Sequence, residues 1–178
     1  MILFPLIYNL QLVSKYIIYN LNYLGLNLYT VKIVKVGNLK IRLYLQAPQH
    51  GSNSFDYRCI QPSYFKNTDG IILVYDITSH YSFENLTYYN EMIEEYSGIG
   101  VIKILAGNKF DEQEIFDVTE EEGHNFAMDN NYLFYQTSAK NNYNVNEVFD
   151  LIVKKLLNTK KHSNRDKKND NKKKCLII

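Results

Sequence analysis

Two short polar segments carry the side chains best suited to bind a ligand. Asn108–Asp111 (N-K-F-D) follows an apolar run at residues 101–106, and Thr137–Lys140 (T-S-A-K) follows a weaker run at residues 132–135. Either segment alone is also typical of a polar loop. If both runs are parallel strands, however, the segments lie at the carboxyl edge of a sheet, where ligands bind in open α/β folds. The pair therefore predicts a binding site that contains hydrogen-bonding groups and lysine side chains.

The C-terminal sequence indicates a lipid-attachment site. Cys175 is followed by three apolar residues, which is the C-a-a-X pattern of prenylation, and the bulky Ile178 favours a geranylgeranyl group. Residues 158–174 contain eight basic and two acidic residues, so this stretch carries +6 and the remainder carries −5 of the total charge of +1. A lysine run often only keeps a tail solvated, but beside a lipid it supplies the second signal for anchoring on an anionic membrane. The expected electrostatic contacts are Lys167, Lys168, Lys172, Lys173 and Lys174.

Other compositional features exclude several classes of protein. The acidic remainder of the chain argues against a nucleic-acid-binding domain. The two cysteines, Cys59 and Cys175, have no metal-ligand spacing and are too few for a disulfide framework. Residues 1–28 are apolar but interrupted by polar residues, which predicts neither a membrane-spanning helix nor a signal peptide. We expect no metal site.

The order of apolar runs predicts how these segments are positioned. Residues 26–36 and 39–45 are expected to form a hairpin around Gly37-Asn38, and residues 70–77 a strand buried on both faces. Three helices are expected. The first covers residues 82–96, the second begins at a capping box formed by Thr119 and Glu122, and the third has a wide apolar face that ends near residue 157. Strands and helices that alternate in this way predict an α/β doubly wound, mostly parallel sheet. We expect one domain at residues 1–157 and a disordered basic tail at residues 158–178.

The two polar segments resemble the guanine-recognition motifs N-K-x-D and S-A-K of the small GTPases. Residues 69–78 (D-G-I-I-L-V-Y-D-I-T) and 82–86 (S-F-E-N-L) resemble the Rab type in particular, and the resemblance covers about residues 24–157 and the tail. It implies that the carboxylate of Asp111 accepts the ring N–H and the exocyclic amino group of guanine, an arrangement that adenine does not offer. It further implies the following roles: Asn108 braces the loop and contacts the base edge, the Lys109 stem lies over the base, the Ala139 N–H that follows Ser138 meets the guanine O6, and Lys140 covers the base.

The phosphate-binding half of that family's site has no counterpart in the sequence. The motif G-x-x-x-x-G-K-[S/T], which holds phosphates and magnesium, is absent, because no glycine precedes Gly25 and Lys15 is the only lysine in that stretch. Tyr23 stands where a magnesium-binding threonine is expected, and residues 45–54 contain no acid in place of the D-T-A-G-Q motif. We therefore expect weak binding of GTP or GDP, no magnesium, no catalytic residue and no GTP hydrolysis.

The resemblance also implies a gap in the sheet. In the family's topology the first strand lies centrally, and the 23 residues before Leu24 are too few to supply it. A sheet without its middle strand must re-pair or expose two rows of backbone groups.

These inferences combine into one expected function and two alternatives. We expect a Rab-family protein of vesicle trafficking that is lipid-anchored to the cytoplasmic face of a membrane. Its expected partners are the membrane surface, a prenyltransferase and Rab effectors or regulators, and no nucleic acid. The alternatives are a nucleotide-independent interaction scaffold and a truncated, non-functional GTPase copy. Nucleotide binding distinguishes the Rab-family protein from the scaffold, and the yield of folded protein distinguishes both from the non-functional copy.

Overall fold

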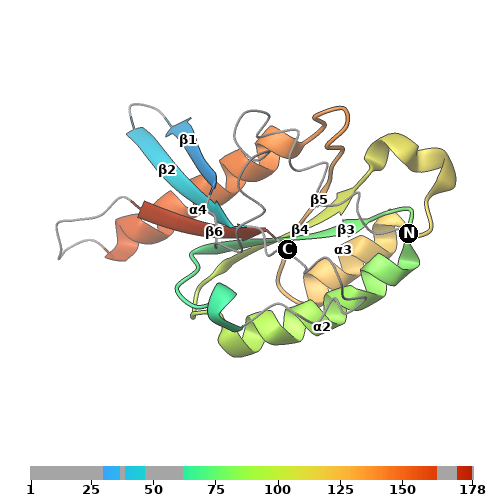
Figure 1. The fold of residues 1–178 in the computed structure, drawn as a ribbon, viewed down its shortest axis with the longest axis horizontal. Helices are drawn as coiled ribbons and strands as arrows, with labels where there is room; N and C mark the ends of the chain where they lie inside the picture. The colour runs from blue at the N-terminus through green and yellow to red at the C-terminus, as the bar shows by residue number, and fades with distance from the viewer. Residues whose placement is uncertain (1–29, 37–38, 47–61, 164–171, 178) are drawn as a thin grey trace, which may run out of the picture.

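One six-stranded sheet with helices on both faces forms the framework of the protein (Figure 1). The computed structural model describes residues 30–36, 39–46, 62–163 and 172–177. The strands are β1 (Thr30–Val36), β2 (Leu39–Gln46), β3 (Gly70–Asp76), β4 (Ile102–Asn108), β5 (Leu133–Gln136) and β6 (Lys172–Ile177). The helices are α2 (His80–Tyr96), α3 (Glu120–Asp129) and α4 (Val145–Ser163), with short 3-10 turns η3 (Pro62–Tyr64) and η4 (Phe110–Ile115). In these described ranges, no helix combines the length and apolar character needed to cross a membrane.

The strands lie in the order β1-β2-β6-β3-β4-β5. β1 and β2 form the predicted antiparallel hairpin, in which Val36 lies opposite Leu39, while every other neighbouring pair is parallel. β3 is an almost wholly buried strand, as its continuous apolar sequence predicts for a strand covered on both faces. The predicted α/β doubly wound, mostly parallel sheet is thus confirmed.

The sequence predicted a disordered tail from residue 158, but the structure shows a C-terminal strand, β6, in this part of the chain. α4 continues to Ser163, and Lys172–Ile177 form a strand between β2 and β3, where the family topology places its first strand. The sheet therefore re-pairs at this central position rather than leaving it empty. The physical reason is that β2 and β3 would otherwise each present a row of unpaired backbone N–H and C=O groups. Residues 164–171, and with them Lys167 and Lys168, lie outside the described residues.

The two faces of the sheet are covered by different helices (Figure 1). α4 packs on one face, where Ile152 and Val153 are fully buried against residues of β3 and β4. α2 and α3 pack on the other, over a cluster centred on Tyr75, Leu86 and Ile93. Ser79 caps α2, and the predicted capping box of Thr119 and Glu122 opens α3. These helices fix the sheet on both sides and so hold the ends of its strands.

The parallel register brings three strand ends to one edge of the sheet. Asp76 at the end of β3 lies beside Asn108 at the end of β4, and Gly107 lies beside Gln136 at the end of β5. Both polar segments singled out in the sequence begin directly at this edge. Their proximity therefore follows from strand direction and register.

Candidate functional site

The loops that follow β4 and β5 are joined by backbone hydrogen bonds. Phe110 N–H donates to the carbonyl oxygen of Thr137 over 3.0 Å, and Thr137 N–H donates to that of Gly107 over 2.8 Å. The aromatic rings of Phe110 and Tyr143 stack beside these loops with their centroids 5.2 Å apart. The N-K-F-D and T-S-A-K segments are therefore held side by side.

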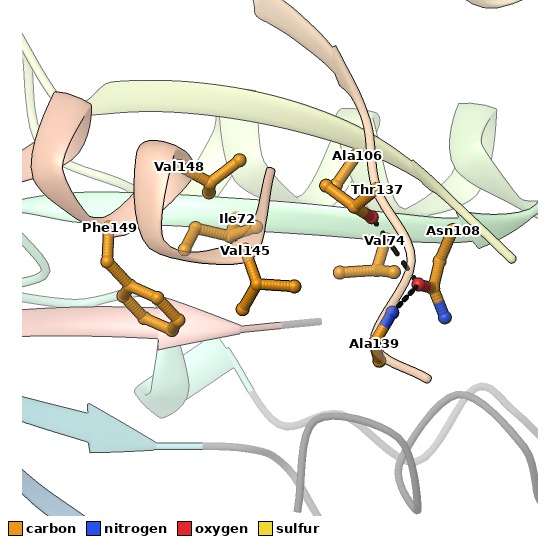
Figure 2. A pocket seen from close by; sticks show the side chains of 9 residues that line it. All are labelled: Ile72, Val74, Ala106, Asn108, Thr137, Ala139, Val145, Val148 and Phe149. Atoms are coloured by element: carbon orange, nitrogen blue, oxygen red, sulfur yellow. Dashed lines mark hydrogen bonds between the residues drawn. The ribbon is translucent and has the colours of Figure 1, made fainter. Parts of the chain in front are cut away.

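Asn108 links the two loops through its side-chain oxygen (Figure 2). Its Oδ1 accepts the backbone N–H of Ala139 over 3.1 Å and the hydroxyl of Thr137 over 3.4 Å. The Asn108 side chain is buried, and its Nδ2 has no hydrogen-bond partner among the residues that the structure describes. A buried donor of this kind is costly unless a ligand, water or another group satisfies it.

An apolar pocket lies beside Asn108, between β3, β4 and the start of α4 (Figure 2). Its lining includes Val74, Ala106, Val145 and Phe149. The pocket volume is about 20 Å³, which holds a water molecule but not a purine ring. This pocket is therefore too small to be a binding site for a base.

Asp111, in η4, is the best-positioned acceptor of the site. Its Oδ1 accepts the hydroxyl of Ser138 over 2.5 Å, and its Oδ2 lies 3.3 Å from the Nζ of Lys140. Burial raises the pKa of the Asp111 carboxyl, but hydrogen bonds from Ser138, from its own backbone and from Lys140 outweigh burial and hold the pKa below its usual value of 3.8. The carboxylate is therefore ionised at neutral pH and available as an acceptor of N–H groups.

Lys140 and Lys109 have different environments. The side chain of Lys140 is 67% exposed and can move over a bound base. Lys109 is mostly buried, and its Nζ lies 2.7 Å from the Oδ2 of Asp76 at the end of β3. Lys109 also has a left-handed backbone with φ of +69°, which is unfavourable for a residue with a Cβ. The ion pair with Asp76 stabilises the loop in that conformation.

Asp76 is a site residue that the sequence reasoning did not select. Its Oδ1 accepts both the backbone N–H and the hydroxyl of Thr78, over 2.9 Å and 2.7 Å. Its two oxygens thus tie Lys109 to the turn that follows β3. The sequence did contain a sign of this role, because Asp76 is the one acid within the apolar run at residues 70–77 and stands near its carboxyl end.

The expected lipid and membrane residues lie elsewhere. Cys175 and Lys172–Lys174 belong to β6, within the sheet. Residues 1–29 and 47–61, where the phosphate, magnesium and D-x-x-G segments of the resembled family would fall, lie outside the described residues. The six predicted base-contact residues therefore lie around one edge of the sheet.

Comparison with known proteins identifies the family. A sequence model of the Ras family matches residues 30–158, which contain all six of the predicted base-contact residues. The chain belongs to the Ras family. Within it the chain is of the Rab type, since Rab-15, Rab-13 and Rab-12 proteins are among its relatives.

Three of these Rab relatives show the extent of the similarity. The Ras-related protein Rab-15 of Homo sapiens is 33% identical over 129 residues, which are 72% of this chain and 59% of that protein. Ras-related protein Rab-13 of Bos taurus is 37% identical over 116 residues, 65% of this chain and 56% of the relative. Ras-related protein Rab-12 of Homo sapiens is 35% identical over 132 residues, 72% and 52% respectively. This Rab-type chain therefore spans less than two thirds of the length of the curated relatives it matches.

Proposed function

We propose that this Rab-type protein binds guanine nucleotides mainly through the base. One observation carries the proposal: the Asp111 carboxylate, the Ala139 N–H and the Lys140 side chain meet at one sheet edge, braced by Asn108. A carboxylate has about four lone-pair positions, so Asp111 can accept two N–H groups of guanine while it keeps Ser138. Adenine has no matching pair of donors, and this difference gives the site its selectivity.

The phosphate groups contribute little to binding in this proposal. The 178 residues contain no G-x-x-x-x-G-K-[S/T] segment and no D-x-x-G frame, so no residue is assigned to phosphate, magnesium or the attacking water. Phosphate and metal contacts supply most nucleotide affinity in phosphate-loop proteins. A chain of this sequence is accordingly a weak GTP or GDP binder that does not hydrolyse GTP and does not require magnesium.

Calorimetric titration tests this division of the binding energy. Guanosine, GDP and GTP should bind with affinities within about threefold of one another and weaker than roughly 1 µM, because the base contacts are common to all three. Adenosine is the matched control and should give no measurable heat of binding. Sub-micromolar binding of GTP, or a large preference for GTP over guanosine, would contradict the proposal, since either requires a phosphate site.

We propose lipid anchoring as the second part of the function. Geranylgeranylation of Cys175, together with the basic residues Lys167, Lys168 and Lys172–Lys174, holds the protein on the cytoplasmic face of a membrane. A prenyltransferase is the required partner, and Rab effectors or regulators of vesicle trafficking are the further partners that family membership supports.

A nucleotide-independent scaffold remains a second candidate because of one observation. The groups assigned to the base already pair with one another: Asp111 with Ser138 and Lys140, and the Ala139 N–H with Asn108. These internal hydrogen bonds hold the two loops together without a ligand. The calorimetric titration described above distinguishes the two candidates, because a nucleotide-independent scaffold gives no heat of binding with guanosine.

A further inference from the structure

β6 is the only hydrogen-bonded link between the β1–β2 hairpin and the rest of the sheet among the described strands. Cys175 lies opposite Leu45 of β2 on one side and Gly70 of β3 on the other, and Ile177 lies opposite Ile72. Both edges of this C-terminal segment are therefore flanked by parallel strands. In Figure 1, β6 lies between the hairpin and β3 and joins them.

The same residues form the prenylation motif. Lipidation forms a thioether bond between the Sγ of Cys175 and the first carbon of geranylgeranyl diphosphate, with loss of the thiol proton and release of diphosphate. The transferase must bind residues 175–178 as a free peptide end to bring that sulfur to the lipid. While Cys175 and Leu176 are paired on both sides within the sheet, that end is not free.

We propose that the position between β2 and β3 is a strand-accepting slot for the chain's own segment Lys172–Ile177, and that occupancy of this slot and lipidation of Cys175 exclude each other. This inference rests on the lipidation proposed above. In the protein without lipid, the lipid-attachment site is part of the central strand β6. The lipidated protein has released that strand.

Release of β6 changes the rest of the sheet in a defined way. The hairpin of β1 and β2 loses its hydrogen-bonded neighbour, and the edge of β3 at Gly70–Ile72 becomes unpaired. The pairing of β3 with β4 and of β4 with β5 does not involve β6 and persists. Membrane attachment and the order of the hairpin are thereby coupled.

A kinetic experiment tests the exclusion. The full chain and a synthetic peptide of residues 164–178 are each incubated with a geranylgeranyltransferase and fluorescent geranylgeranyl diphosphate. The peptide should be modified roughly tenfold or more faster than the folded chain, which reacts only when β6 opens. Lys173→Pro removes a backbone N–H from β6 and leaves residues 175–178 intact, so this full-length variant should approach the peptide's rate. Asn169→Pro, a proline placed ahead of β6 at a residue with no assigned role, should react as slowly as the unsubstituted chain.

The outcomes separate this inference from the lipidation itself. If the folded chain reacts as fast as the peptide, or Lys173→Pro reacts no faster than Asn169→Pro, lipidation stands and the exclusion is overturned. If the peptide is not modified, the proposed lipidation of Cys175 fails, and the exclusion fails with it.

Hydrogen exchange tests the slot without the enzyme. In the unmodified chain the amides of Lys172–Ile177 should exchange more slowly than in the peptide. Lys173→Pro should speed exchange in Leu39–Gln46 and Gly70–Ile72 but not in Leu133–Gln136. Equal exchange of residues 172–177 in chain and peptide would show that the slot is empty in solution and would overturn the proposal.

Discussion

Changing Cys175 to serine should move the protein from the membrane to the soluble fraction of a cell that contains prenyltransferases. A serine hydroxyl is not a substrate for thioether formation, so the variant keeps only the attraction of its basic residues. That attraction amounts to about 1 kcal/mol for each lysine close to an anionic leaflet, and salt screens it within about 8 Å. Fractionation of cells that express each protein measures the membrane-bound share.

Two further variants test whether the loss of membrane binding in Cys175→Ser is due to the missing lipid. Cys59→Ser makes the same substitution at the other cysteine of the chain and should leave the protein membrane-bound. Replacing Lys172, Lys173 and Lys174 by glutamine should reduce the membrane-bound share while lipid is still incorporated at Cys175. If Cys175→Ser stays as membrane-bound as the protein without the substitution, the anchor lies elsewhere, and residues 1–29 become the segment to test.

Changing Asp111 to asparagine should reverse the base preference of the site. An asparagine side chain cannot accept at both of its ends, so it cannot bind the ring N–H and the amino group of guanine together. Guanosine affinity should fall roughly 100-fold, or about 2.7 kcal/mol. Xanthosine has a carbonyl in place of that amino group, and the new amide N–H₂ can donate to it. Xanthosine should therefore bind the variant more tightly than guanosine does.

Competition with a labelled guanine nucleotide measures this reversal, and one variant controls for charge. Asp150→Asn removes the same charge from an exposed position on α4 and should leave both affinities unchanged. An Asp111→Asn protein that binds guanosine as the unmodified protein does would remove Asp111 from the site.

Local sequence patterns were sufficient for much of the fold. The Gly37-Asn38 pair between two β-branched runs predicted the β1–β2 hairpin, and Thr119 with Glu122 predicted the start of α3. Asn108 and Ser138 were predicted at one edge because both follow apolar runs that are parallel strands. These features depend on residues close together in the chain or on strand direction alone.

β6 could not be predicted in this way, because its cause is not local. The segment K-K-K-C-L-I follows a run of lysine and asparagine, a composition that favours a solvated tail. Its pairing depends on the open backbone groups of β2 and β3, more than a hundred residues earlier in the chain. Likewise, the contact of Lys109 with Asp76 depends on the register between β3 and β4.

The backbone N–H of Ala139 gives the most direct test of the guanine site. In the structure this group donates to the Oδ1 of Asn108, and in the proposed complex it meets the O6 of guanine. In ¹⁵N-labelled protein titrated with guanosine, the Ala139 amide resonance should shift progressively and saturate, and adenosine at the same concentrations should leave it in place. An Ala139 resonance that guanosine does not move, or that adenosine moves equally, would contradict base recognition by this protein.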